Sequence, residues 1–123
     1  MILVDTSVWI DHLRRHSNAL AKLLHAGTVL THPFVIGELA LGNLRQREVV
    51  LSALSDLPPA NVATAEEVLH FVDQHALFGR GVGYVDVHLL AAVRLTPGAK
   101  FWTHDKRLHG AATQLGLAIT QPD

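Results

Sequence analysis

Short apolar runs and helical patterns of apolar residues alternate along the chain. Residues 1–4 are all apolar, and such a run is typical of a strand buried on both faces. The pattern predicts further short strands at 28–31, 99–103 and 117–119. Apolar residues spaced three or four positions apart predict helices at 7–14, 17–27, from 33 onwards, 45–54, 64–76, 85–95 and 105–116. This alternation predicts a three-layer α/β/α domain with a central, mainly parallel sheet.

Several residues suit the starts and ends of these helices. Good starting residues are Thr6, Ser7, Ser17, Pro33 and Thr64. Glu67 follows Thr64 by three positions, which is the spacing of a capping box. Glu67 is therefore interpreted as structural. Gly27 is expected to stop the second helix.

Length and composition limit the classes of protein to consider. With 123 residues, of which 49% are hydrophobic, the chain predicts one domain spanning 1–123 with a proper core. Cysteine is absent, which excludes disulfides, a thiol nucleophile and cysteine-based metal sites. No apolar stretch approaches the roughly 20 residues that span a bilayer, and no secretory signal is evident. We therefore expect a cytoplasmic protein that does not bind membranes.

The charge of the chain is nearly balanced. A formal net charge of −1 argues against binding nucleic acid by overall charge alone, so any such contact must be local. Small basic groups that could line a groove are Arg14 with Arg15, Arg45 with Arg47, and Lys106 with Arg107. The alternative for each pair is an ordinary solvated surface.

Four acidic residues stand next to apolar segments: Asp5, Glu38, Asp86 and Asp105. A lone buried carboxylate is strongly disfavoured unless a partner, hydrogen bonds or a cation compensates. Asp5 and Asp105 each follow a predicted strand, and ligands of parallel sheets bind beyond the carboxyl ends of the strands. Several such acids converging would bind a divalent cation through hard oxygen ligands.

The two other acids lie on predicted helices. Glu38 is spaced three or four positions from Phe34, Val35 and Leu41, so we expect it to face inward with them. Asp86 falls in the first turn of a nearly apolar helix, where the helix dipole favours an anion. Helix faces of this kind do not normally include an unpaired acid.

Each acid also has a simpler interpretation. Asp105 precedes a helix and could be only its N-cap, and Asp5 could be a turn residue. The helix acids could instead form buried salt bridges, for which Arg94 and Lys100 are the candidate cations. No obvious set of inward cations balances all four acids.

Other chemistries fit the sequence less well. The nine histidines suggest metal-free acid–base cleavage through a ribose 2′-hydroxyl, but nothing singles out a catalytic pair. His12 and His16 have the spacing of a zinc pair without a third ligand nearby. A haloacid-dehalogenase-like phosphatase would carry an Asp where this chain has Ser7. The acid pair of a response-regulator receiver is also missing.

Four motifs occur in order along the chain: residues 5–10 (DTSVWI), 35–39 (VIGEL), 85–92 (VDVHLLAA) and 102–108 (WTHDKRL). In this order and at these intervals they resemble the acidic motifs of PIN-domain ribonucleases, and in particular of VapC toxins from bacterial toxin–antitoxin pairs. The resemblance covers essentially the whole chain. It implies a PIN-like fold, an endoribonuclease dependent on Mg²⁺ or Mn²⁺, a homodimer and an inhibitory VapB-like antitoxin.

The same motifs assign roles to the acids. Asp5 and Asp86 are predicted to be the most direct metal ligands, Glu38 a ligand or the group that orients the attacking water, and Asp105 a second-metal or outer acid. Hydrogen bonds to these acids are expected from Thr6 and Thr103. The RNA substrate would be a structured tRNA or rRNA. The alternative function is a non-catalytic PIN-like module that binds RNA or protein.

Overall fold

Strands and helices alternate as the hydrophobic pattern predicts. The computed structural model describes residues 1–120; residues 121–123, the end of the predicted domain, lie outside the described part. The strands are β1 (Ile2–Val4), β2 (Val29–Leu30) and β3 (Lys100–Trp102). The helices are α1 (Thr6–Arg14), α2 (Asn18–His25), α3 (Pro33–Ala40), α4 (Arg47–Ser55), α5 (Ala65–His75), α6 (Tyr84–Leu95) and α7 (Lys106–Gln114).

The sheet is parallel, with the strand order β2-β1-β3. Strand β1 is therefore central, and both Leu3 and Val4 are fully buried. The strand predicted at 117–119 is reduced to an isolated parallel bridge between Phe101 and Ala118. Two backbone hydrogen bonds flank this bridge, from Phe101 to Leu117 O and from Ile119 to Phe101 O, so the segment still covers the edge of β3.

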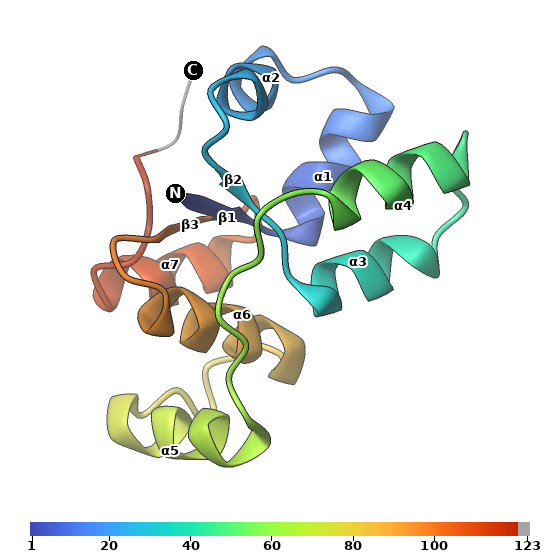
Figure 1. Ribbon diagram of the computed structural model, residues 1–123. Helices are drawn as coiled ribbons and strands as arrows, with labels where there is room; N and C mark the ends of the chain where they lie inside the picture. The colour runs from blue at the N-terminus through green and yellow to red at the C-terminus, as the bar shows by residue number, and fades with distance from the viewer. Residues whose placement is uncertain (121–123) are drawn as a thin grey trace.

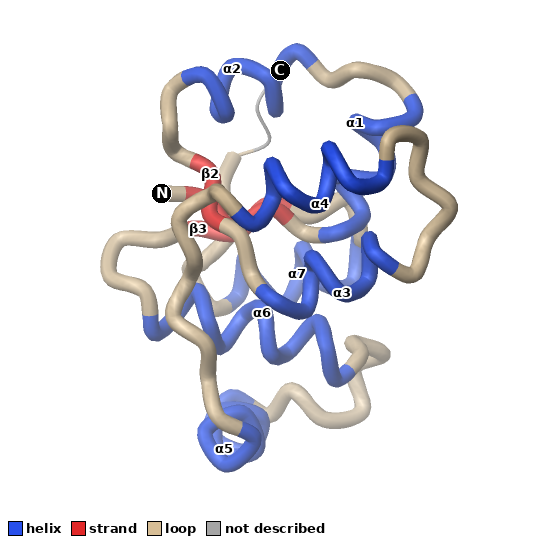
Figure 2. Tube along the Cα trace, turned by 45° about the vertical axis from the view of Figure 1, so that its right-hand side comes forward, coloured by secondary structure: helices blue, strands red, loops and turns tan. Residues whose placement is uncertain are grey.

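Helices cover the sheet on both sides. Figure 1 shows α2 above the sheet and α6 and α7 below it, while α5 lies farther out and packs against α6. The tube in Figure 2 keeps the same arrangement, with α5 again at the far end of the molecule. The predicted α/β/α class is confirmed. None of the helices in residues 1–120 is both long and apolar enough to span a membrane.

The helix starts marked by Ser17, Pro33 and Thr64 agree with the sequence, whereas the first helix begins one residue earlier and the fourth two residues later than predicted. Ser17 accepts a hydrogen bond from Leu20 N at 3.3 Å, and Thr64 and Glu67 form the predicted capping box. The prediction that Ser7 begins the first helix was wrong, because α1 starts at Thr6 and Asp5 occupies the N-cap position. The hydroxyls of Thr6 and Ser7 instead bind neighbouring carboxylates.

The predicted inward face of α3 also needs correction. Its buried residues are Val35 and Leu39, four positions apart, whereas Leu41 lies beyond the last turn and is 90% exposed. Glu38 is likewise exposed rather than inward. Its side chain reaches sideways to α1, where Thr6 Oγ1 donates a hydrogen bond to Glu38 Oε1 at 2.7 Å. Glu38 thus lies at the edge of the core.

A buried histidine starts α3. His32 has no exposed surface, and its Nδ1 accepts a hydrogen bond from Phe34 N at 3.0 Å. The ring of Phe34 lies edge-on to the buried His88, with 4.7 Å between ring centroids. Desolvation, together with the nearby His88, lowers the pKa of His32 to about 4. His32 is therefore neutral at physiological pH.

Candidate metal centre

Two neighbouring strands bring the first and last acid together. Asp5 follows β1 and its backbone N donates to Trp102 O at 2.9 Å, so the ends of β1 and β3 are in register. Asp105 follows β3 by three residues. Because parallel strands end at the same edge of a sheet, both acids lie there. Glu38 approaches from α3 and Asp86 from the first turn of α6.

Asp5 is the most deeply buried of the acids, with 5% of its surface exposed. Its Oδ2 accepts hydrogen bonds from Ser7 Oγ at 2.6 Å and from Thr103 Oγ1 at 2.8 Å. Thr103 Oγ1 also accepts from Asp105 N at 3.1 Å. One threonine hydroxyl thus links the ends of the two strands and fixes the orientation of Asp5.

The other acids are each held by one hydrogen bond. Glu38 accepts from Thr6, as described above, and Asp86 Oδ2 accepts from Gly83 N at 3.1 Å. A side chain at position 83 would bring Cβ within 3.2 Å of that oxygen, so glycine lets the carboxylate approach the backbone. Asp105 Oδ1 caps α7 by accepting from Leu108 N at 2.9 Å.

All four carboxylates share one arrangement. In each, one oxygen accepts a hydrogen bond from the protein, and these oxygens are Asp5 Oδ2, Glu38 Oε1, Asp86 Oδ2 and Asp105 Oδ1. The second oxygen of each has no hydrogen-bond partner within residues 1–120. The N-cap interpretation of Asp105 is therefore correct and compatible with a further role, because one of its oxygens stays free.

Salt bridges do not balance these acids. Arg94 donates to Leu115 O and Lys100 donates to Gly116 O, so neither candidate cation reaches Glu38 or Asp86. In the part of the chain that the structure describes, the one ion pair joins His104 and Asp11. Within residues 1–120, no protein cation forms an ion pair with any of the four acids.

The charges of the other three acids bear on the ionisation of Asp86. Desolvation raises the pKa of Asp86, and the negative charges of Asp5, Asp105 and Glu38 raise it further, while the hydrogen bond from Gly83 opposes them. All three other acids are therefore close enough to disfavour ionisation of Asp86. A cation bound among the four acids would instead favour the ionised form of Asp86.

The donor set fits a hard divalent cation held partly through water. No group of three or more His, Asp or Glu side chains within residues 1–120 is arranged to hold a metal ion directly. Mg²⁺ usually takes only one or two protein carboxylates and keeps several waters. Four carboxylates with one free oxygen each can supply that coordination. His12 and His16 have no third ligand arranged for a zinc ion within residues 1–120, and His12 Nδ1 already accepts from Ser17 N at 2.9 Å.

Sequence reasoning missed one contact beside the acids. His104 Nδ1 lies 2.5 Å from Asp11 Oδ2, and His104 N donates to Ser7 Oγ at 3.1 Å. Ser7 in turn donates to Asp5. The pair therefore ties α1 to the loop after β3 through the same hydroxyl that holds Asp5. Asp11 is four positions after Ser7 on the same helix face, which is the signal that could have indicated it.

Two comparisons with known proteins agree with this geometry. The family model of the PIN domain matches residues 2–113. Ribonuclease VapC32 of Mycobacterium tuberculosis, from strains CDC 1551 / Oshkosh and ATCC 25618 / H37Rv, is 50% identical over 121 residues, which cover 98% of each chain. The chain belongs to the PIN-domain family, and this similarity places it among the VapC members. The family predicted from the four motifs is confirmed.

The raised pKa of Asp86 predicts how the metal-free protein depends on pH. A folded-state pKa above the unfolded value means that Asp86 supports folding below pH 3.8 and opposes it as pH rises through the folded pKa. Asp86→Asn keeps an acceptor for Gly83 N and removes the charge. In EDTA at pH 7 we expect its melting temperature to rise by up to a few degrees, since solvent screening limits the gain to below about 1 kcal/mol.

Thermal melts at pH 7 and pH 3.5 would check this expectation. The gain should vanish at the lower pH, where wild-type Asp86 is protonated. Asp73→Asn, on the exposed surface of α5, is the matched control and should change nothing. A variant equally or less stable than wild type at pH 7 would show that the four acids do not repel one another.

Proposed function

We propose that this chain is the toxin of a toxin–antitoxin pair and an endoribonuclease that depends on Mg²⁺ or Mn²⁺. The observation that carries the proposal is the arrangement of the four carboxylates. Each has one oxygen engaged by the protein and one oxygen free. Asp5 and Asp105 follow β1 and β3, while Glu38 and Asp86 belong to α3 and α6. The ribonuclease names of the VapC32 relatives support the same activity.

Each of the four acids has a proposed role in RNA cleavage. When bound, the divalent cation supplies activation of a water molecule and neutralises charge on the phosphate. Asp5 and Asp86 would be the most direct ligands of the cation. Glu38, oriented by Thr6, would hold the cation or position the attacking water. Asp105 would contribute a second or outer interaction. Attack by water leaves a 5′-phosphate and a 3′-hydroxyl end.

The partners follow from the same assignment. We propose a VapB-like antitoxin as the inhibitory partner, a structured tRNA or rRNA as the substrate, and a homodimer of a single-domain chain that acts in the cytoplasm. The VapC name of the relatives supports the antitoxin partner. An antitoxin can inhibit by placing a cationic side chain among the acids in place of the metal.

The experiment that tests the activity is cleavage of total cellular RNA by the purified, antitoxin-free chain. Reactions contain Mg²⁺, Mn²⁺ or EDTA, and the new ends are mapped. We expect discrete cuts with 5′-phosphate ends in the presence of either cation and none in EDTA, because water is activated only when the cation is bound.

Two other results would contradict the proposal. Cuts that persist in EDTA and leave 2′,3′-cyclic phosphates would indicate attack by the ribose hydroxyl, as in a histidine mechanism. Absence of cuts from protein with verified cation binding would favour the alternative, a PIN-like module that binds RNA or protein without cleaving.

A further inference from the structure

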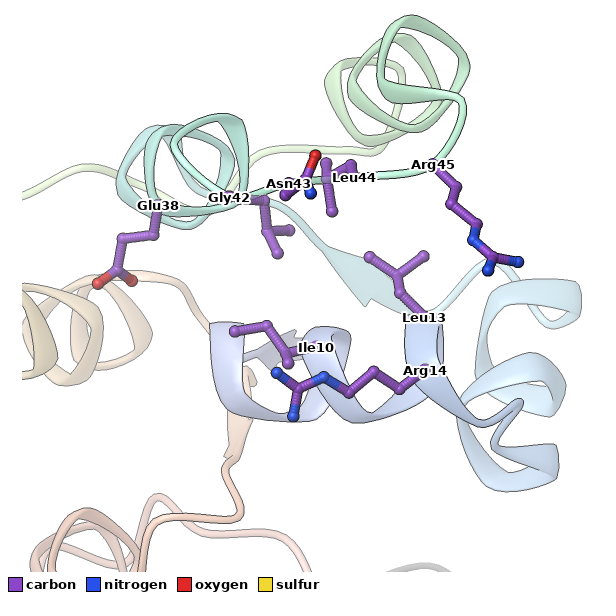
Figure 3. A pocket seen from close by; sticks show the side chains of 9 residues that line it. Ile10, Leu13, Arg14, Glu38, Gly42, Asn43, Leu44 and Arg45 are labelled. Carbon is purple, nitrogen blue, oxygen red and sulfur yellow. The ribbon is translucent and has the colours of Figure 1, made fainter.

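A groove leads away from the candidate metal centre between α1 and the segment that joins α3 to α4. Figure 3 shows Ile10, Leu13 and Arg14 on one wall and Leu44 and Arg45 on the other. Glu38 lies at one end, so the groove reaches one of the four acids of the candidate centre. Its volume of about 500 Å³ is within the range of ordinary ligand sites.

Two cations line this groove without protein partners. Neither Arg14 nor Arg45 forms a hydrogen bond or an ion pair within residues 1–120. Several other cations of the chain are engaged: Arg47 with Ala40 O, Arg80 with Gln114, Arg94 with Leu115 O and Lys100 with Gly116 O. The structure thus separates Arg45, in the groove, from Arg47, which is tied to the end of α3.

The charge of the groove is opposite to that of the centre beside it. The groove lining contains two cations, Arg14 and Arg45, and one carboxylate, Glu38. A chain with net charge −1 can bind a polyanion only where cations gather locally. Guanidinium groups match phosphate oxygens with two parallel hydrogen bonds, so these two are suited to a phosphodiester backbone.

The walls between the cations are apolar. Ile10 is 37% exposed and Leu13 is 40% exposed, and both line the groove. Figure 3 shows Leu13 directed toward Leu44 and Ile10 directed toward the end where Glu38 lies. Exposed apolar side chains here can cover the face of an unpaired base or a ribose. A groove with cations for phosphates and apolar surface for bases fits a single strand of nucleic acid.

We propose that this groove binds the single-stranded RNA segment next to the scissile phosphate, with Arg14 and Arg45 on its phosphates. The inference rests on the proposed function, because it assigns the substrate path of the same centre. Arg45 and Arg14 are then residues that position the substrate, and the groove determines that the cut lies in an unpaired region.

Binding can be measured without cleavage, which separates this inference from the activity. The probe is a 5′-fluorescein single-stranded 12-nucleotide RNA of mixed sequence, titrated in EDTA and followed by anisotropy at several NaCl concentrations. We expect Arg14→Ala and Arg45→Ala each to weaken binding about fivefold or more. Each should also lower the slope of log affinity against log salt by roughly 0.7, the value for one phosphate contact on a single strand.

Arg15→Ala is the matched control, because Arg15 adjoins Arg14 in sequence and is exposed but does not line the groove. It should leave affinity and salt slope unchanged. Equal losses in all three variants would indicate diffuse attraction and overturn the proposal. Unchanged RNA binding with weakened antitoxin binding would assign the groove to a protein partner and overturn it as well.

The cleavage assay distinguishes failure of the groove proposal from failure of the proposed ribonuclease function. If wild type cuts RNA and the groove variants cut equally well, the groove proposal fails and the proposed function stands. If wild type binds the probe through both arginines but never cuts, the groove proposal stands and the ribonuclease assignment fails.

Discussion

Asp5→Asn and Asp86→Asn are each expected to lower RNA cleavage by about 10²- to 10³-fold while leaving the protein folded. Each substitution removes the negative charge of a carboxylate that we propose binds the cation, and loss of one such stabilising group costs a reaction roughly this factor. A thousandfold loss corresponds to about 4 kcal/mol in the barrier. Initial rates of cleavage of a mapped RNA site at saturating Mg²⁺ would provide the measurement.

Asparagine is the right replacement at Asp5 because it retains one oxygen to accept from Ser7 and Thr103. Alanine would leave both hydroxyls without that acceptor, at a cost of roughly 1–3 kcal/mol each if they stay unpaired. Loss of activity in the alanine variant would then mix folding with chemistry. Asp73→Asn serves again as the surface control. Cleavage within tenfold of wild type by either site variant would refute the assignment of that acid.

The second large effect concerns stability in acid. The pKa of His32 is lowered to about 4, so between pH 6.5 and pH 4 the unfolded chain binds a proton that the folded protein does not. The stability linked to His32 is therefore complete above pH 6.5 and is lost as pH falls toward 4. At 1.36 kcal/mol per pKa unit, wild type should lose about 2 kcal/mol between pH 7 and pH 4.5 from this residue.

His32→Asn tests the effect because asparagine can still accept from Phe34 N at the start of α3 but does not titrate. Urea denaturation at pH 7 and pH 4.5 should show a smaller decline for the variant than for wild type. His70→Asn, an exposed histidine on α5, should retain the wild-type decline. The same decline in all three proteins would mean that His32 is not a source of acid sensitivity.

The order of strands and helices could be predicted from the sequence alone. Strands and helices differ in the spacing of their apolar residues, and several helices begin at residues that favour a helix N-terminus. It also predicted that Asp5 and Asp105 lie at the same edge, since parallel strands end together and β1 and β3 are neighbours. The family followed from four motifs in order. The roles of Asp5, Glu38, Asp86 and Asp105 as metal ligands stay predictions.

Other features depend on tertiary contacts that periodicity does not encode. Glu38 shares a helical spacing with apolar residues, yet the end of α3 leaves it and Leu41 at the surface. Ser7 has the chemistry of a helix cap, but its hydroxyl instead donates a hydrogen bond to the buried carboxylate of Asp5, which is a strong acceptor because it is charged. The pairing of Asp11 with His104 joins residues far apart in sequence and needed the folded chain to be found.

In each carboxylate, one oxygen is hydrogen-bonded to the protein and the other is free. This arrangement affects which mutations can inactivate the protein without unfolding it. Asparagine preserves one acceptor oxygen at Asp5, Asp86 and Asp105. The codons of aspartate and asparagine differ by a single base, so one transition mutation at any of these positions is enough. We expect selection against the toxin to yield, among other variants, inert proteins that still fold.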